Sequence, residues 1–268
     1  GGRRRRPRAP APPARHAMKT FALLLLCWLA PLAAADAPGA AETAYAKGDY
    51  AGAVELWSKE IRAEGVTAAR LAALGNAEWR LGRKGRAMVC WERALLIDPR
   101  DPVANAGIKH GLDAGGVDRP KPTAVEEYAA FLTADLWLLL AVASFWTAVL
   151  CVAVPRLRGR AASEGNQWTR VVALTLLALC FPGLWGSRSL DARAVIRKPE
   201  VSLRLTPTQL GEPMSGVSEG DVVRTERPLN GHMRVRTADG KTGWVRAGEI
   251  EAVRGPGLPA DLDQKAAP

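Results

Sequence analysis

Cysteine and histidine are scarce in this sequence, and their scarcity limits the chemistry that it can support. Its 268 residues include four Cys and three His, with no CxxC pair and no Cys/His cluster. Zinc sites and disulfide frameworks require such pairs or clusters. We therefore predict no metal, no disulfide framework and no cofactor. Cys151 and Cys180 fall inside apolar runs, where a role as small apolar side chains is expected.

Two short matches to catalytic motifs lack the context that those motifs need. Gly216–Gly220 fits the G-x-S-x-G pattern, but a β-rich run follows where a nucleophile elbow requires a helix. Gly240-Lys241-Thr242 ends like a phosphate-binding loop, but Val235 stands where the first glycine belongs. We predict a protein without enzymatic activity. A hydrolase acting through Ser218 is the alternative, which loss of activity in Ser218→Ala would reveal.

Acidic residues are absent from residues 1–35, which hold seven of the 37 Lys and Arg residues. The net charge of +10 therefore comes mostly from this leader, because the rest of the chain has 30 basic against 27 acidic residues. A charge confined to a leader does not form a nucleic-acid-binding face. The sequence predicts no nucleic-acid partner.

Residues 1–35 are typical of a leader that contains a signal peptide. Met18 is followed by one Lys, residues 21–29 (FALLLLCWL) form an apolar core, and three alanines ending at Ala35 supply a small-residue cleavage site. Two interpretations of residues 1–17 stay open. Either the true start is Met18, or these residues are a long basic extension of the signal.

Residues 36–112 contain a repeat with a period of 34 residues. The residues that coincide at this shift are Ala41 and Gly75, Gly48 and Gly82, Ala53 and Ala87, Trp57 and Trp91, and Ile61 and Leu95. This is the period of tetratricopeptide repeats, each of which is a hairpin of two helices. We predict two such hairpins, with residues 101–112 as a partial third helix that caps them. An unrelated pair of helical hairpins is the alternative.

The first helix of each predicted hairpin would line a concave groove. By the repeat register, the candidate partner-binding residues are Glu42, Tyr45, Asn76, Trp79 and Arg80. Arg and Trp are favoured at interface hot spots. For Trp79, packing against the neighbouring hairpin is the alternative.

Two apolar runs predict transmembrane helices at residues 132–154 and 168–187. Residues 136–154 alone give 19 positions without a charge. They would span ~28 Å as a helix, close to the ~30 Å of a hydrocarbon core. Residues 113–124 are rich in Gly and Pro and predict a linker before the first span. Two buried core helices of a soluble protein are the alternative.

The charges of the loop between the spans predict the topology. Residues 155–167 carry Arg156, Arg158 and Arg160 against one acid, Glu164. Basic loops stay on the cytoplasmic side, and a signal peptide exports the residues that precede the first span. Both soluble modules are therefore predicted to lie outside the cytoplasm.

Residues 192–253 alternate short β-rich runs with turns. Five runs are expected to form strands, and Asp239-Gly240 is a tight-turn signal between the last two. Five such strands in a short module predict a small all-β barrel. The run DGKTGWV at residues 239–245, with the Glu219-Gly220 step before a Val-Val strand, resembles the bacterial SH3 family.

The surface of this SH3-like module has two candidate binding residues. They are Arg234 and Trp244, with Trp244 expected to be half core and half surface, and His232 is expected to face solvent. The module has no Tyr or Phe, so an aromatic-lined groove for Pro-rich ligands is not expected. Residues 254–268 are predicted to be a disordered tail.

The order of signal, tetratricopeptide repeats, two spans and SH3-like module resembles the BatE-type proteins of bacterial aerotolerance operons. The resemblance implies a scaffold in the bacterial inner membrane, with both modules on the periplasmic side. It also implies operon partners that include von Willebrand A-type membrane proteins and a MoxR-type ATPase. Peptidoglycan binding through the SH3-like module is the alternative function.

Overall fold

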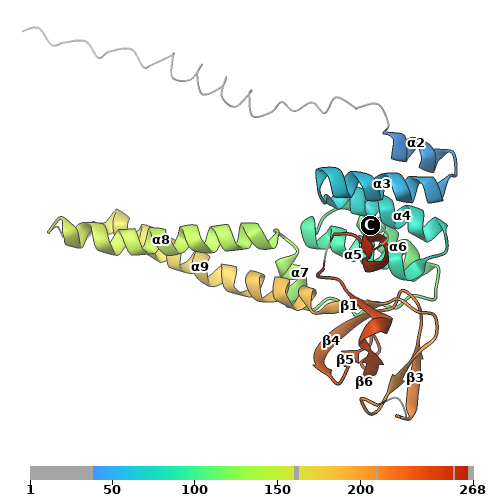
Figure 1. Ribbon diagram of the computed structural model, residues 1–268. Coiled ribbons are helices and arrows are strands. Elements are labelled where there is room, and N and C mark those ends of the chain that lie inside the picture. The colour runs from blue at the N-terminus through green and yellow to red at the C-terminus, as the bar shows by residue number, and fades with distance from the viewer. Residues whose placement is uncertain (1–38, 160–162, 209–210, 256, 265–268) are drawn as a thin grey trace, which may run out of the picture. The chain divides into compact units, whose positions relative to one another are not determined.

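The computed structural model describes residues 39–159, 163–208, 211–255 and 257–264. The predicted leader and signal peptide lie outside them. From Ala40 onwards the residues belong to a single packed unit. Along the chain this unit has a helical module, a pair of long helices and an antiparallel sheet (Figure 1).

The helical module forms where the helix hairpins were predicted. Its helices are α2 (Ala40–Ala46), α3 (Tyr50–Glu64), α4 (Ala68–Arg80), α5 (Lys84–Ile97) and α6 (Pro102–Asp113). Gly48 and Gly82, which coincide in the repeat, have φ values of +82° and +76° in the turns that follow α2 and α4. Glycine is favoured in this left-handed conformation because it has no Cβ. The predicted helices are confirmed, and their identity as tetratricopeptide repeats stays a prediction.

Trp91 fills the centre of the helical module. It is 1% exposed, and its Nε1 donates hydrogen bonds to the Ala72 carbonyl oxygen at 3.3 Å and to Asn76 Oδ1 at 3.1 Å. Gly75 of α4 and Gly107 of α6 lie against its ring, and a Cβ on Gly107 would come within 2.4 Å of Trp91 Cε2. Small residues thus make room for the aromatic side chain, as the repeat pattern predicts.

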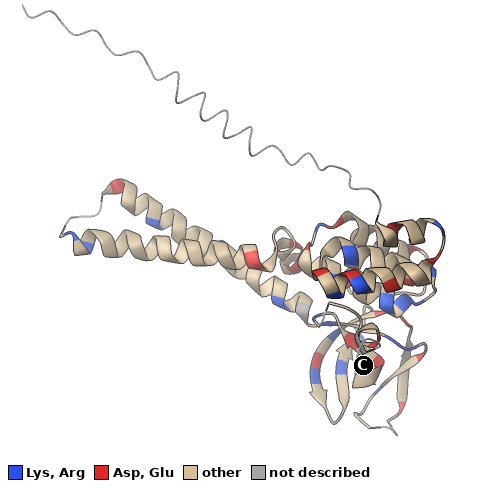
Figure 2. Ribbon diagram, turned by 45° about the horizontal axis from the view of Figure 1, so that its top comes forward, with Lys and Arg blue, Asp and Glu red and all other residues tan. Residues whose placement is uncertain are grey.

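Two long helices, α8 (Ala134–Leu157) and α9 (Glu164–Asp191), pack side by side. Residues 134–157 and 164–190 are long and apolar enough to cross a membrane, with mean hydropathies of 2.3 and 1.5. Only 17% and 22% of their most apolar stretches are buried, which does not fit the alternative of buried core helices. Figure 2 shows that charged residues gather on the helical module and the sheet, with few along this helix pair. These features fit membrane association.

The connection between the two helices is shorter than the predicted loop at residues 155–167. Helix α8 continues through Pro155 to Leu157, and α9 already begins at Glu164. The Ser163 hydroxyl caps α9 by accepting a hydrogen bond from the Asn166 N–H at 3.3 Å. An apolar run identifies only the part of a helix that would face lipid, whereas capping residues fix where the helix begins and ends. The two helices therefore extend beyond their apolar runs and leave a shorter connection.

The short helix α7 (Ala124–Ala129) joins the helix pair to the rest of the unit. It packs against the end of α9, where Gly186 comes so close that a Cβ would lie 2.3 Å from the Val125 carbonyl oxygen. Tyr128 also donates a hydrogen bond to the Leu179 carbonyl oxygen at 3.0 Å. The entry to α8 and the exit from α9 therefore lie at the same end of the helix pair (Figure 1).

The C-terminal module is an open antiparallel sheet. Its strands are β1 (Arg193–Ile196), β2 (Val201–Arg204), β3 (Pro213–Val217), β4 (Val222–Leu229), β5 (His232–Arg236), β6 (Thr242–Arg246) and β7 (Ile250–Ala252). Their order is β3-β2-β6-β5-β4-β1-β7. The predicted barrel of five strands is therefore corrected, because among the described residues β3 and β7 stay at the edges and the sheet does not close. Strand β3 (PMSGV) has no alternation of apolar residues, and β7 has three residues, so sequence patterns identify neither.

Two local predictions for the sheet have opposite outcomes. The tight turn at Asp239-Gly240 is confirmed, with the Thr237 N–H donating to the Lys241 carbonyl oxygen at 3.0 Å and a φ of +84° at Gly240. The prediction that His232 faces solvent is wrong, because it is 8% exposed. Its Nδ1 lies 3.0 Å from the Asn230 carbonyl oxygen, since the preceding turn folds back on the strand.

The described parts of the predicted linker and of the predicted disordered tail are both folded. In the linker, Val117 is 3% exposed in the helical core, and the Asp118 carbonyl oxygen accepts a hydrogen bond from the Val222 N–H at 2.8 Å. In the tail, residues Ala260–Gln264 form helix α10. Contacts with distant segments order both stretches, and composition alone does not reveal such contacts.

Candidate functional site

Two of the predicted groove residues, Tyr45 of α2 and Arg80 of α4, come together on the helical module. The Tyr45 ring packs edge-on against Tyr50, with centroids 5.2 Å apart. The Arg80 guanidinium lies 6.0 Å from the centroid of the same Tyr50 ring, and a hydrogen bond with Tyr45 raises the pKa of Arg80. Arg80 is exposed and Tyr45 is half-buried, so a partner can reach both.

The other three predicted groove residues support tryptophans of the helical module. Glu42 Oε1 accepts a hydrogen bond from Trp57 Nε1 at 3.4 Å, as Asn76 does from Trp91. The Trp79 ring packs against Trp91 and His110, with centroid distances of 5.6 and 5.9 Å. For Trp79 the structure therefore favours the packing interpretation. Glu42 remains exposed, whereas Asn76 and Trp79 are partly buried.

The predicted surface residues of the sheet lie side by side on β5 and β6. Trp244, expected to be half exposed, is 7% exposed, because Arg227 of β4 lies 5.8 Å from its ring centroid and covers it. Arg234 pairs across the strands with Trp244, and its Nε lies 3.1 Å from Glu226 Oε2. Arg234 is thus partly accessible, but Trp244 does not form a binding surface.

A buried group of charges connects the modules, and the sequence predictions missed it. We call it the central ionic cluster; it consists of Glu92, Arg119, Glu126, Arg193 and Arg224. Arg193 is 1% exposed and stands at its centre. Its Nη1 lies 3.5 Å from Glu92 Oε2, and its Nη2 lies 3.2 Å from Glu126 Oε2. Arg119 and Arg224 bind the same two carboxylates at 3.2 and 2.8 Å.

Each charge of the cluster comes from a different element. Glu92 belongs to α5, Arg119 to the linker, Glu126 to α7, Arg193 to β1 and Arg224 to β4. The Ser189 hydroxyl at the end of α9 adds a hydrogen bond to Glu126 Oε1 at 2.9 Å. The helical module, the long helix pair and the sheet are therefore joined by ion pairs and a hydrogen bond within this one cluster.

The electrostatics of the cluster follow from its burial. Burial acts to raise the pKa of Glu126, but the Thr123 N–H, the Arg193 charge and the Ser189 hydroxyl stabilise the carboxylate, and its pKa is lowered overall. Burial lowers the pKa of the Arg193 guanidinium, which Glu92 opposes. A guanidinium keeps its proton despite such a shift, so Arg193 stays charged between Glu92 and Glu126.

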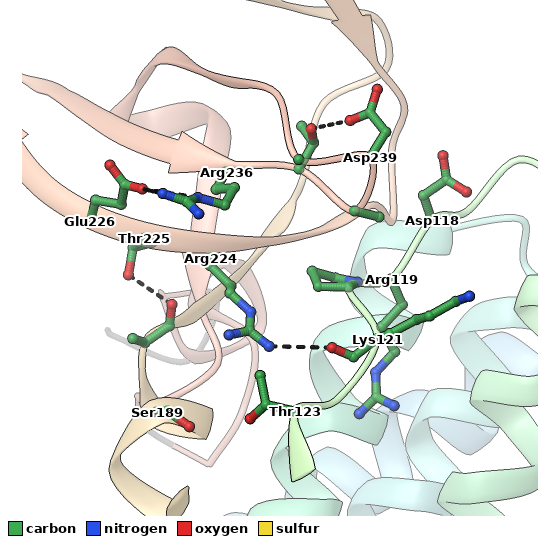
Figure 3. Close-up of a pocket in the computed structure, with 15 residues that line it drawn as sticks. Asp118, Arg119, Lys121, Thr123, Ser189, Arg224, Thr225, Glu226, Arg236 and Asp239 are labelled. Carbon is green, nitrogen blue, oxygen red and sulfur yellow. Dashed lines mark hydrogen bonds and ion pairs between the residues drawn. The ribbon is translucent and has the colours of Figure 1, made fainter. Parts of the chain in front are cut away.

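A cleft of about 860 Å³ opens beside the cluster, between the linker and the sheet (Figure 3). Arg224 reaches across it and donates a hydrogen bond to the Lys121 carbonyl oxygen at 3.3 Å. On the far wall, Arg236 pairs with Glu226 at 2.9 Å. Among the described residues, no three His, Cys, Asp or Glu side chains gather in a way that would hold a metal ion. The arginines that line the cleft, Arg119, Arg224 and Arg236, pair with protein groups.

A second group of charges fastens the end of the chain to the helical module. Arg93, next to Glu92 on α5, is 5% exposed. It donates hydrogen bonds to the carbonyl oxygens of Val253 and Ala252 at 3.0 Å each, to that of Leu258 at 2.5 Å, and to Glu251 Oε1 at 2.8 Å. One buried arginine thus binds the last strand and the segment that follows it.

The sequence contains two signals that could have identified the clusters. Glu92 and Arg93 stand between Trp91 and Ala94 in a helix that is otherwise apolar on that side, and all four are buried. Glu126 is the third residue after Thr123, in a capping box that both hydrogen bonds complete. Arg193 carries no such signal, because it resembles any charge that follows a membrane helix.

No protein-family model matches the chain, and a search of the curated proteins found no match. The class of the protein therefore rests on its own structure. That structure combines a helical module, two helices that could span a membrane and an open antiparallel sheet, joined through buried ion pairs.

We predict that Arg193→Met strongly destabilises the protein. The substitution leaves Glu92 and Glu126 buried with fewer partners, and breaking a buried pair costs about 3–5 kcal/mol. Thermal unfolding in detergent, followed by tryptophan fluorescence, measures the effect. Arg236→Met is the matched control, because that arginine is largely exposed and exposed pairs contribute about 0–1 kcal/mol. Equal melting temperatures for the two variants would contradict a structural role for the cluster.

We also predict that the stability supplied by Glu126 depends on pH. Its pKa is lower in the folded state, so its contribution is complete above the unfolded value of about 4.3 and is lost as the pH falls through the folded value. The melting temperature should fall with acidification below about pH 4.3, and Glu126→Gln should flatten that dependence. Glu127→Gln, at the exposed neighbouring position, should keep the wild-type profile. A Glu126→Gln profile as steep as wild type would refute the assignment.

Proposed function

We propose that the protein is a non-enzymatic membrane scaffold that holds two protein-binding modules at one membrane face. The observation that carries this proposal is that the helical module and the sheet are fastened together at one end of the long helix pair. Glu126 lies in α7, the short helix before that pair, Arg193 begins β1 directly after it, and their side chains are 3.2 Å apart. If the pair crosses a bilayer, both modules stand on the same side.

The sequence supports one orientation of this arrangement. The short connection between α8 and α9 contains Arg158 and follows Arg156 in the last turn of α8, and basic loops remain in the cytoplasm. The modules would then face the periplasm of a bacterial inner membrane, which agrees with the predicted signal peptide. The chain would act as an anchor, with little of it inside the cell.

The accessible part of the groove supports partner binding by the helical module. Arg80 is exposed beside the aromatic rings of Tyr45 and Tyr50, and arginine and tyrosine are enriched at interface hot spots. The resemblance to BatE-type proteins suggests membrane partners of the von Willebrand A type in a stress-tolerance complex. The central ionic cluster would fix the groove relative to the membrane, so a bound partner would be held in a defined position.

The structure offers less support for peptidoglycan binding by the sheet. Trp244 is the only Trp, Tyr or Phe in residues 192–253, and it is 7% exposed. Sugar and peptide ligands commonly pack on exposed aromatic rings, and this module presents none among its described residues. Protein binding through the groove is therefore the function that we favour.

We predict that both modules are accessible from outside the cytoplasm. In a variant whose native cysteines are replaced by serine or alanine, a single cysteine would be introduced in place of Lys47, Lys198 or Arg158, which lie before, after and between the two helices. A membrane-impermeant maleimide applied to spheroplasts should label the first two, and should label the third only after lysis. Labelling of Arg158→Cys in intact spheroplasts, without Lys47→Cys or Lys198→Cys, would reverse the orientation.

We predict that Arg80→Glu weakens partner binding about tenfold or more, the effect of losing ~1.4 kcal/mol or more at a hot spot. Co-purification from detergent with a co-expressed von Willebrand A-type protein measures this. Lys198→Glu, an exposed charge reversal next to the sheet, is the control and should bind normally. Because Arg80 is exposed, the variant should fold, which its melting temperature checks. Unchanged recovery with Arg80→Glu would remove the groove from the proposal.

A further inference from the structure

The C-terminal segment, residues 257–264, folds back onto the helical module. Leu258 and Leu262 are 3% and 8% exposed and belong to the same hydrophobic core as Trp91. A leucine pair buried in this way behaves as part of the core. The segment therefore packs against helices that are distant from it in the sequence, in the way that a separate peptide would bind to them.

Polar contacts hold the same segment on a basic face formed by α3 and α5. Arg62 of α3 donates a hydrogen bond to the Leu262 carbonyl oxygen at 2.8 Å. Asp261 forms ion pairs with Arg86 of α5 and with Arg197, the residue directly after β1, the latter at 2.9 Å. The face thus accepts an acidic side chain between two leucine contacts.

The segment covers only part of this face. Next to Leu262 the groove between α3 and the start of α5 remains open as a cleft of about 520 Å³. The α3 wall of the cleft runs from Ala51 to Arg62, which is about 16 Å of helix, whereas the five residues of α10 cover about 7.5 Å. Among the described residues of the C-terminal segment, only Asp261 and Leu262 line this cleft, so the rest of its lining is open to further contacts.

The lining of the groove includes one buried polar group without a hydrogen-bond partner. The Ser58 hydroxyl lines it, is 2% exposed, and has no hydrogen-bond partner among the described residues. A buried hydroxyl without a partner is unfavourable, and a ligand that enters the cleft can supply one. Four cations also line the cleft, Lys59, Arg62, Arg83 and Arg86, against two acids, Glu55 and Asp261. Arg83 and Arg86 pair in addition with the buried Glu78, so the surplus positive charge lies mainly on the α3 side, at Lys59 and Arg62.

We propose that this groove is a docking site for an acidic, leucine-bearing helical segment of a partner protein. The C-terminal segment of the chain itself occupies part of it and shows which chemistry fits. Lys59 and Arg62 attract acidic side chains, the apolar contacts accept leucine, and the open part of the lining accepts a longer helix. This face belongs to α3 and α5, whereas Arg80 and Tyr45 lie on α4 and α2, so the inference stands independently of the proposed function.

A fluorescently labelled peptide that repeats residues 257–264 (GLPADLDQ) is the probe, with full-length protein in detergent. Leu262→Ser in the protein weakens the competing internal segment and should increase probe affinity about tenfold over wild type. Adding Lys59→Glu and Arg62→Glu should remove that gain, whereas adding Lys109→Glu on α6 should not.

A probe with both aspartates replaced by lysine should not bind. If Leu262→Ser lowers the melting temperature too far, Asp261→Asn replaces it, with about a threefold gain expected.

Several results would overturn the proposal. Probe affinity that does not respond to Lys59→Glu with Arg62→Glu would show that the groove is not the site. Equal displacement of the probe by inorganic phosphate or by phosphatidylglycerol vesicles would assign the groove to small anions or lipid. Dimers of the Leu262→Ser protein would assign it to a second copy. If deleting only residues 265–268 raised the affinity for the probe, the occupant of the groove would be this chain's own C-terminal residues and not a partner protein.

Discussion

The burial of Arg193 between two carboxylates is the interaction on which the arrangement of this protein depends. Removing a guanidinium from water costs several kcal/mol, and only close, well-paired anions compensate that cost. Here the anions come from α5 and α7, at 3.5 and 3.2 Å. Strand β1 can therefore take its place only when the helical module and the base of the long helix pair are both present. The three parts are energetically coupled rather than connected by free linkers.

This coupling has a consequence for function. In the proposed scaffold, two modules on flexible tethers would let each partner diffuse separately, whereas two joined modules would hold bound partners at fixed distances from the membrane. Arg93 strengthens the connection by binding the end of the sheet and the C-terminal segment to the same helix that carries Glu92. Helix α5 thus contacts the sheet on one side and completes the repeat core on the other.

Local signals were enough to predict much of the fold. The 34-residue repeat predicted the helix hairpins, since small residues and Trp91 coincide with the positions where helices must approach closely. The apolar runs predicted the two long helices, and Asp239-Gly240 predicted the turn between β5 and β6. The open edges of the sheet, the burial of Trp244 and the folded linker were not predicted. The order of the strands, the cover that Arg227 gives Trp244 and the hydrogen bond between Val222 and Asp118 all depend on pairing between separate segments of the chain.

The same division applies to the candidate sites. The sequence by itself determined the segments, their order and the chemistry available on them, because helix period, apolar length and turn residues are local properties. It also predicted that Tyr45 and Arg80 share one face, and in the structure both lie against the Tyr50 ring. Only the tertiary structure decided that Glu42, Asn76 and Trp79 support other side chains, and that Glu92, Glu126 and Arg193 meet. A charge looks the same in sequence whether it faces water or a buried partner, and the distance to that partner is set only when the chain folds.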